Sequence, residues 1–392
     1  MSEYMPSHRC VHMLVWNDFR HDARVLKEAQ TLQATGYQVV VHAVHAPGKT
    51  RRRELLLDRI EVCRSGNLPV RRNLPTKVFS RLWWHWVVFC RLLVVRPSVI
   101  HAHDINTLPT AWAAAKLTGA PLVYDAHEIS ASREGYARVR GVVAWLERKL
   151  MPCAVGIITT TVARAKFFAR VYGIERPLVL QNRPRQQSPL VSNRIREELG
   201  LVQPWPIVVY QGGLQQGRGL ERLVRVAAMV PDAYFVFIGG GLLDASLRSI
   251  AAELGLEDRV RFIPTVALAE LPSYTASADI GVQPIENTCL NHYTTDSNKL
   301  FEYVQAGLPV VASDLPEIRR VVRANDLGLL VPEGDTEALA AALRSLVEDK
   351  AMREFYAGRS RTAAAVLNWE AQEGDLVALY ERVLGGKSRL TQ

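Results

Sequence analysis

Short apolar segments alternate with amphipathic segments along most of the chain. The apolar run at 11–15 is followed by a polar loop, a helix predicted over about 23–35 and a second apolar run, YQVVVHAV. Gly36 ends the predicted helix, as glycine commonly does. Further apolar runs follow at 98–102, 121–128 and 156–161. Apolar strands that alternate with helices predict a parallel sheet covered by helices on both faces.

The same alternation restarts after a polar, proline-bearing segment at 181–190, which reads as a linker. Beyond it, WPIVVYQGG and AYFVFIGGG are strands that run into glycine, and a last amphipathic helix is predicted over about 368–384. A chain of 392 residues is long enough for two domains. We therefore predict an α/β protein with two tandem, doubly wound domains: an N-terminal domain at 1–185, a C-terminal domain at 190–365 and a C-terminal helix at 366–392 that packs back towards the first domain.

Charge is unevenly distributed between the two halves. Residues 1–190 hold 28 Lys and Arg against 13 Asp and Glu, whereas the rest of the chain holds 20 against 26. A basic first half favours an anionic partner, such as a phosphorylated acceptor, a membrane surface or nucleic acid, although it also serves solubility.

The cysteines indicate a reducing compartment. All five are scattered and none forms a CxxC pair, which argues against a disulfide framework or a zinc site. The first ten residues lack the apolar core of a signal peptide, and no run of about 18 uncharged apolar residues is present. We expect a cytoplasmic protein.

The segment NKLFEYVQAGLPVVAS, at 298–313, carries the strongest chemical signal. Glu302 lies near the start of a predicted helix, where a carboxylate can accept hydrogen bonds from a ribose diol. Lys299, three residues earlier on the same helix face, can neutralise a diphosphate, and the helix N-terminus adds positive potential. An ordinary Lys–Glu pair on a helix surface is the alternative.

A glycine-rich turn, YQGGLQQGRGLERL, offers a second phosphate site. Glycines at Gly212 and Gly213 allow backbone N–H groups to approach phosphate oxygens, and Arg218 can bind them bidentately. The related run IGGG lacks the GxGxxG spacing of dinucleotide-binding enzymes, which disfavours a dehydrogenase.

Polar residues also end the predicted strands of the first half. They are candidates for contacts in a binding cleft, because ligands of open α/β sheets bind beyond the carboxyl ends of the strands. His101 is expected in or near the core. Histidines and carboxylates of this kind can also ligate a metal ion. A polar sheet edge has the same composition, however, and we expect no metal. The candidates are Asp18, His103, Asp104, Asp125, His127 and Glu128.

Taken together, these segments resemble glycosyltransferase family 4, a group of retaining enzymes with the GT-B fold. The resemblance extends over nearly the whole chain, from NDFRHDARVLKEAQTLQATGYQVVVHA through VIHAHDINTLPTAWAAAKLTGAPLVYDAHE to the two donor-site segments. It implies two Rossmann-like domains that face a central cleft, an N-terminal acceptor domain and a C-terminal nucleotide-sugar domain.

The resemblance also implies roles for individual residues. Glu302 matches the second glutamate of the family's E-x7-E motif, which holds the ribose, but Thr294 stands where the first glutamate belongs. Gly213 and Arg218 occupy the places of the family's donor-loop Arg and Lys, and Lys299 can restore the missing charge. Substitutes for the first glutamate, and further donor contacts, are expected among Asn291, Tyr293, Asp296, Ser297 and Asn298.

The implied reaction is a metal-independent sugar transfer with retention, without a cofactor other than the nucleotide-diphosphate-sugar donor. His103 and Asp104 would act near the reacting centre, and Arg218 and Lys299 would stabilise the leaving diphosphate. The acceptor would be a saccharide, a lipid-linked molecule or another small molecule, and no nucleic acid is expected. The alternatives are a nucleotide-sugar epimerase of the same fold and a non-catalytic binding protein.

The segment KVFSRLWWHWVVFCRLLVVR, at 77–96, has two interpretations. Its apolar residues crowd more than one helix face, which is compatible with a helix buried against the N-terminal sheet. Its tryptophans among Arg and Lys are equally typical of an interfacial helix on an anionic membrane. In the second case the protein would be peripheral at the inner face of the membrane.

Overall fold

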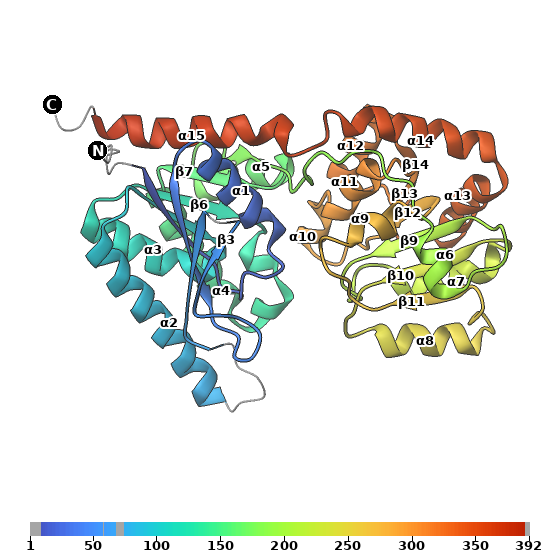
Figure 1. Cartoon of the computed structure of the whole chain (residues 1–392), viewed down its shortest axis with the longest axis horizontal. Helices are drawn as coiled ribbons and strands as arrows, with labels where there is room; N and C mark the ends of the chain where they lie inside the picture. Colours follow the sequence, from blue (N-terminus) through green and yellow to red (C-terminus); the bar gives the residue numbers. More distant parts are fainter. Residues whose placement is uncertain (1–8, 58, 68–73, 389–392) are drawn as a thin grey trace. The chain divides into compact units, whose positions relative to one another are not determined.

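The chain forms two compact units in the computed structural model, which describes residues 9–57, 59–67 and 74–388 (Figure 1). Unit 1 comprises Met1–Gln181 and Gln372–Gln392, and unit 2 comprises Asn182–Ala371. The predicted linker segment lies at the start of unit 2 and has no regular secondary structure. The chain returns to unit 1 at Gln372, later than residue 366, because the buried Trp369 still belongs to unit 2 and donates its N–H to the Pro184 carbonyl.

Unit 1 is built on an eight-stranded sheet in the order β3-β4-β2-β1-β5-β6-β7-β8. Its edge strand β3 runs antiparallel to β4, and the other neighbouring pairs are parallel. The strands are β1 (Cys10–Leu14), β2 (Gln38–Val44), β3 (Arg53–Leu56), β4 (Ile60–Ser65), β5 (Val99–His103), β6 (Leu122–Ala126), β7 (Gly156–Thr159) and β8 (Leu178–Val179).

Helices cover both faces of this sheet, as the alternating pattern predicts. They are α1 (Ala23–Ala34), α2 (Leu74–Val95), α3 (Asp104–Thr118), α4 (Arg140–Leu150), α5 (Val162–Tyr172) and the C-terminal α15 (Glu370–Ser388), with 3-10 turns η1 (Ser130–Ser132), η2 (Glu134–Val139) and η3 (Met151–Cys153). The helix α15 packs on unit 1, where the Tyr380 hydroxyl lies 2.8 Å from His101 Nδ1 on β5.

Unit 2 contains a six-stranded, entirely parallel sheet in the order β11-β10-β9-β12-β13-β14. Its strands are β9 (Ile207–Gln211), β10 (Tyr234–Ile238), β11 (Val260–Ile263), β12 (Ile280–Gln283), β13 (Val310–Ser313) and β14 (Gly328–Val331). Successive residues of β9 join different cores, Val208 on one face and Val209 on the other, because side chains alternate along a strand.

The helices of unit 2 follow the strands in the doubly wound manner. They are α6 (Arg194–Leu199), α7 (Leu220–Met229), α8 (Asp244–Glu253), α9 (Leu271–Thr275), α10 (Leu290–Tyr293), α11 (Asn298–Gln305), α12 (Pro316–Asn325), α13 (Thr336–Glu348) and α14 (Lys350–Ala364).

Both sheets reverse their strand order once. In unit 1 the chain builds outward from β1 in one direction and then from β5 in the other, and in unit 2 it does so from β9 and then from β12. At such a reversal the connections leave in opposite directions, and the carboxyl ends of the two central strands remain open to a ligand. The fold thus marks one binding position in each unit.

The helix α2 fits neither sequence interpretation completely. Trp84, Val88 and Leu92 form one narrow buried face, and Trp84 Nε1 donates a hydrogen bond to the Ala43 carbonyl at 2.8 Å. The opposite face is exposed, with Phe79 at 69% and Trp86 at 60% exposure. Within the described residues, Val78–Val95 is the one helical stretch long and apolar enough to cross a membrane, since its two arginines do not lower its hydropathy sufficiently to exclude it.

Candidate active site

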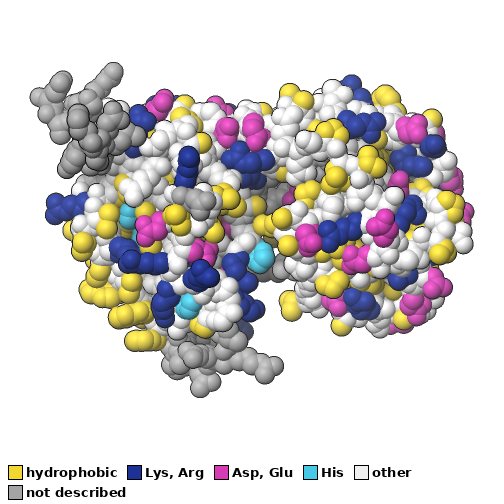
Figure 2. All heavy atoms as spheres, in the orientation of Figure 1, with side chains coloured by type: hydrophobic (Ala, Val, Ile, Leu, Met, Phe, Trp, Pro, Cys, Tyr) yellow, Lys and Arg dark blue, Asp and Glu magenta, His cyan; other side chains and the backbone are white. Residues whose placement is uncertain are grey.

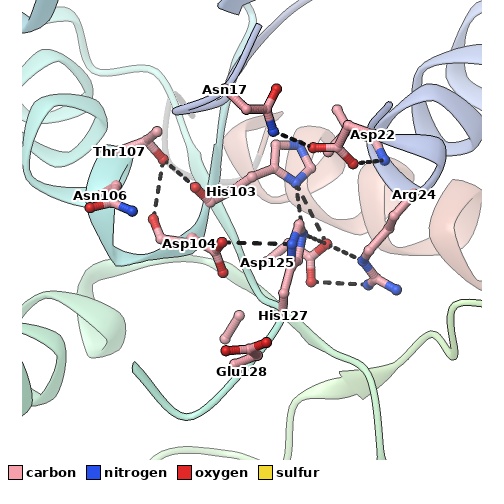
Figure 3. A network of polar contacts seen from close by, with 12 residues as sticks. Asn17, Asp22, Arg24, His103, Asp104, Asn106, Thr107, Asp125, His127 and Glu128 are labelled. Carbon is pink, nitrogen blue, oxygen red and sulfur yellow. Dashed lines mark hydrogen bonds and ion pairs between the residues drawn. The ribbon is translucent and has the colours of Figure 1, made fainter. Parts of the chain in front are cut away.

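A buried ion pair underlies the polar cluster of unit 1 (Figure 3). Asp125, fully buried on β6, accepts hydrogen bonds from Arg24 Nε at 2.7 Å and Arg24 Nη2 at 3.0 Å. Burial alone would raise the pKa of Asp125, but Arg24 and the neighbouring histidines outweigh it and hold this pKa well below its usual range. Asp125 is therefore an ionised group that orients its neighbours and does not face solvent.

Two histidines share this carboxylate and carry different charges. His127 Nε2 lies 3.0 Å from Asp125 Oδ2 and His127 Nδ1 lies 3.8 Å from Asp104 Oδ2. Burial lowers the pKa of His127, yet the two carboxylates outweigh it and raise the pKa to about 9. The pKa of His103 is lowered, chiefly by burial, and its Nε2 has no hydrogen-bond partner within the described residues. At neutral pH the cluster thus contains an imidazolium beside a neutral imidazole.

The outer part of the cluster is a small network of charges. Arg133 contacts Glu128 at 3.1 Å and Asp104 at 3.4 Å. Asp104 begins α3 with a φ of 60°, an unusual conformation for a residue other than glycine. Residues held in such conformations gather at functional sites, where the surrounding structure maintains them. Asp18 lies apart from this network and pairs with Arg20 at 2.7 Å.

The cluster continues into the core of unit 1. Glu28, His101, His103 and Asp125 bring possible metal ligands within 4.8 Å of one another. However, the Arg24 guanidinium lies 3.3 Å from Glu28 and 2.7 Å from Asp125, so a cation already compensates these carboxylates. Burial and Asp125 raise the pKa of Glu28 well above its usual range. The arrangement favours a proton on Glu28 over a bound metal ion.

The glycine-rich turn of unit 2 brings backbone close to backbone at the end of β9. Gly219 has a φ of 69°, and a methyl group there would lie 2.0 Å from the Pro284 carbonyl oxygen. A methyl group at Gly239 would lie 2.1 Å from the Gly212 carbonyl oxygen. Side chains are therefore excluded from these positions, and close backbone packing holds the turn in place.

Two cations lie beside this backbone. Lys299 is buried, with 8% of its surface exposed. Its Nζ lies close to Gly212, where a methyl group would be 3.6 Å away from it. The same Nζ lies 5.0 Å from the centre of the Tyr210 ring. Burial and the nearby positive charge of Arg218 lower the pKa of Lys299 to about 7. A strained residue, Ser297 with a φ of 53°, precedes α11, whose N-terminus adds positive potential. These groups together place positive potential beside the glycine turn.

Glu302 is held in place by residues that the sequence analysis did not identify. Gln211 Nε2 donates to Glu302 Oε2 at 2.5 Å, and Thr275 Oγ1 donates to Gln211 Oε1 at 2.8 Å. The Gln211 amide is thus fixed from both sides and occupies Oε2 of Glu302. The other oxygen of this carboxylate is left for a ligand. The signal in the sequence is a polar residue that ends an apolar strand directly before Gly212.

Thr294, at the place of the missing first glutamate, does not supply a carboxylate. Thr294 is buried, and its hydroxyl donates to the Leu290 carbonyl at 2.7 Å. Among the proposed substitutes, Asn291 and Asp296 are buried, whereas Tyr293 and Asn298 are exposed beside the donor segments and Ser297 is half-buried. Gly213 is exposed at the glycine turn.

Comparison with known families assigns a family to both units of the chain. Residues 22–183 match the family model described as glycosyl transferase 4-like domain, and residues 205–349 match glycosyl transferases group 1. The chain belongs to the group 1 glycosyltransferases of the family 4 type. This membership makes it an enzyme and disfavours the epimerase and the non-catalytic binding protein as alternatives.

Individual relatives are distant but extend over most of the chain. A phosphatidyl-myo-inositol mannosyltransferase of Mycobacterium leprae is 26% identical over 94% of both chains, and a D-inositol 3-phosphate glycosyltransferase of Thermomonospora curvata is 25% identical over 72% of this chain and 71% of its own. Among solved structures, sucrose-phosphate synthase from Thermosynechococcus elongatus has a TM-score of 0.83 at 18% identity, and covers 96% of this chain and 100% of its own. Anabaena HepE with UDP-glucose has a TM-score of 0.71 at 20% identity, and covers 97% and 100%. These structures establish the GT-B fold.

The lowered pKa of Lys299 predicts a pH-dependent affinity for a diphosphate. Below pH 7 the Lys299 side chain of the ligand-free protein is already charged. Above pH 7 it must take up a proton in order to pair with the ligand. Affinity for a nucleoside diphosphate is therefore expected to fall as pH rises from 7 to 9, approaching roughly tenfold per pH unit. Calorimetric titration at several pH values measures this, and Lys299→Met should bind weakly with no corresponding fall. An affinity in the native protein that is constant over this range would contradict the assignment.

Proposed function

We propose that the enzyme transfers a sugar, with retention of configuration, from a nucleoside diphosphate sugar bound by unit 2 to an acceptor bound by unit 1. The observation that carries this proposal is the donor-type site of unit 2. There Glu302 stands in the second turn of α11, while Arg218, Lys299 and the glycine turn supply positive potential next to it. A ribose on the carboxylate and a diphosphate on the cations account for each of these groups.

Charge develops on the diphosphate as the bond to the sugar breaks. Cations and oriented backbone N–H groups that are already in place stabilise such charge without reorganisation. The close neighbourhood of Arg218 and Lys299 disfavours two cations in the empty site, and an anion between them removes that penalty. The site therefore binds the leaving group more tightly as its charge grows.

Unit 1 supports a mechanism without a protein nucleophile. A double-displacement mechanism needs a free carboxylate about 5 Å from a second one. Asp125 is buried and bound bidentately by Arg24, so it is unavailable for attack on a sugar. The proposed alternative is attack from the face of the departing diphosphate, whose oxygen takes the acceptor proton. His103, neutral and with a buried Nε2 that has no hydrogen-bond partner among the described residues, would position a hydroxyl group of the donor sugar or of the acceptor.

Removal of Glu302 should weaken nucleotide binding. A charge-assisted hydrogen bond contributes roughly 1.5–3 kcal/mol, so Glu302→Ala is expected to weaken UDP binding by tenfold or more in calorimetry. The matched variant is His103→Ala, in unit 1, which should lower turnover and leave UDP affinity unchanged. A folded Glu302→Ala protein with native UDP affinity would remove the basis of the proposed donor site.

The reaction should need no divalent metal. Arg218, Lys299 and the α11 N-terminus supply the positive charge that a metal gives to other sugar transferases. Sugar transfer from the donor is expected to proceed unchanged in excess EDTA, measured by nucleoside diphosphate release. Loss of activity in EDTA that magnesium or manganese restores would contradict this.

We propose further that the enzyme works at the cytoplasmic surface of an anionic membrane, which it contacts through α2. The exposed face repeats apolar residues at helical spacing in Phe79, Trp83 and Trp86, and Figure 2 shows hydrophobic side chains gathered over this helix. Arg81 lies on the same helix and Arg96 follows its end. Because the opposite face packs on the sheet of unit 1, α2 is suited to lie along a membrane surface and not to cross it.

Contact with lipid predicts a binding that depends on both charge and apolar surface. The protein should sediment with vesicles containing phosphatidylglycerol at low salt and less so at high salt, because salt screens each cation's contribution of about 1 kcal/mol. Trp86→Glu should reduce the bound fraction several-fold. The control Leu117→Glu makes the same charge change at a residue on α3 that is 67% exposed, and should bind like the native protein. Equal binding by both variants would contradict a role of α2.

A further inference from the structure

Three helices of unit 1 line an open pocket that the proposed function does not use. The pocket has a volume of about 240 Å³ and lies between α2, α3 and α4. Sites that enclose whole small molecules usually measure about 300–1,000 Å³, so this pocket suits a slender part of a ligand. Its wall includes Leu82, His85, Pro109, Thr110, Val143 and Leu146.

The polar groups in this wall are bonded to one another. His85 Nδ1 lies 2.7 Å from Thr110 Oγ1, and burial together with Arg81 lowers the pKa of His85 to about 4, so the ring is neutral. Asn106 Oδ1 accepts hydrogen bonds from Arg81 at 2.5 Å and from Tyr136 at 2.6 Å. The pocket therefore offers an incoming ligand mainly carbon surface.

The pocket adjoins the polar cluster of unit 1. Asp104, which contacts His127 and Arg133, and Asn106, which lines the pocket, belong to the same first turn of α3. The Arg133 guanidinium also lies 6.0 Å from the centre of the Tyr136 ring, another part of the pocket wall. Asp104 and Asn106 are about 3 Å apart along the axis of α3, so the apolar pocket and the polar cluster meet at the same end of this helix.

The helix α4 exposes a second apolar and basic surface next to the pocket. Val142 is 65% and Trp145 is 60% exposed, while the neighbouring Val143 lines the pocket. Exposed cations of this helix are Arg140, Arg148 and Lys149. Its one acid, Glu147, is buried and accepts hydrogen bonds from the hydroxyls of three neighbouring residues, Tyr124, Ser130 and Tyr172.

From this arrangement we infer that the acceptor is a lipid-linked molecule, whose apolar chain enters the pocket between α2 and α4. The inference rests on the proposed function, because it names the class of acceptor. Arg81 lines the pocket and Arg133 lies at its edge against Tyr136, and these two guanidinium groups fit a head group that carries a phosphate. The remainder of the acceptor's apolar chain stays in the membrane, which the exposed sides of α2 and α4 contact.

Alkyl phosphates of increasing length test the pocket. Octyl, nonyl and decyl phosphate are titrated into the full-length protein below their micelle concentrations. Affinity should rise by roughly fourfold for each methylene that enters the pocket. Val143→Trp fills the pocket and should abolish this dependence, whereas Val142→Trp, one position along and exposed, should retain it. A native protein that binds all three lengths equally, or a folded Val143→Trp protein that behaves like it, would overturn the inference.

Photolabelling gives an answer that depends on no variant. Decyl phosphate with a diazirine at the end of its chain should label peptides that contain residues 82–85, 105–110 or 143–146. Labelling that avoids all three would also overturn the inference. UDP affinity serves as the separate control, since the donor site lies in unit 2 and both Trp variants should bind UDP like the native protein. Failure of the native protein to bind UDP, GDP and ADP alike would overturn the proposed function itself.

Discussion

The single reversal of strand order in each sheet is the constraint on which the rest of this structure depends. It occurs between β1 and β5 in unit 1 and between β9 and β12 in unit 2, and it leaves the carboxyl ends of these strands open. His103 ends β5, and the glycine turn follows β9. The proposed chemistry of the enzyme therefore follows the topology, and the side chains around each reversal are the candidates for substrate contacts.

Burial then fixes the charge of the groups at these two positions. In unit 1 the Arg24–Asp125 pair keeps a carboxylate ionised inside the protein, and this carboxylate sustains the charge of His127 while His103 stays neutral. In unit 2 burial beside a second cation brings the pKa of Lys299 to about 7. An anionic ligand relieves this unfavourable proximity of charges, so the binding of substrate and the electrostatics of the empty site are linked.

The sequence predicted the tandem doubly wound fold because alternating apolar strands and amphipathic helices have few other solutions. It also predicted which segments lie at the strand ends, including the glycine turn and α11. The sequence did not predict contacts between segments that are distant along the chain. Such contacts join Gln211 to Glu302, Arg24 to Asp125 and Tyr380 to His101, which are 91, 101 and 279 positions apart. The second exposed helix, α4, was also missed, since its apolar residues are few and only the structure separates the exposed ones from those that line the pocket.

Hydrogen exchange in the presence of UDP tests the central claim most directly, because it reports where the nucleotide binds without any change to the protein. The account predicts slower exchange of backbone amides in residues 212–219 and at the start of α11, with no protection at the carboxyl ends of β5 and β6 in unit 1. Protection confined to unit 1, or absent from the glycine turn and α11 at saturating UDP, would contradict the assignment of the donor to the strand reversal of unit 2.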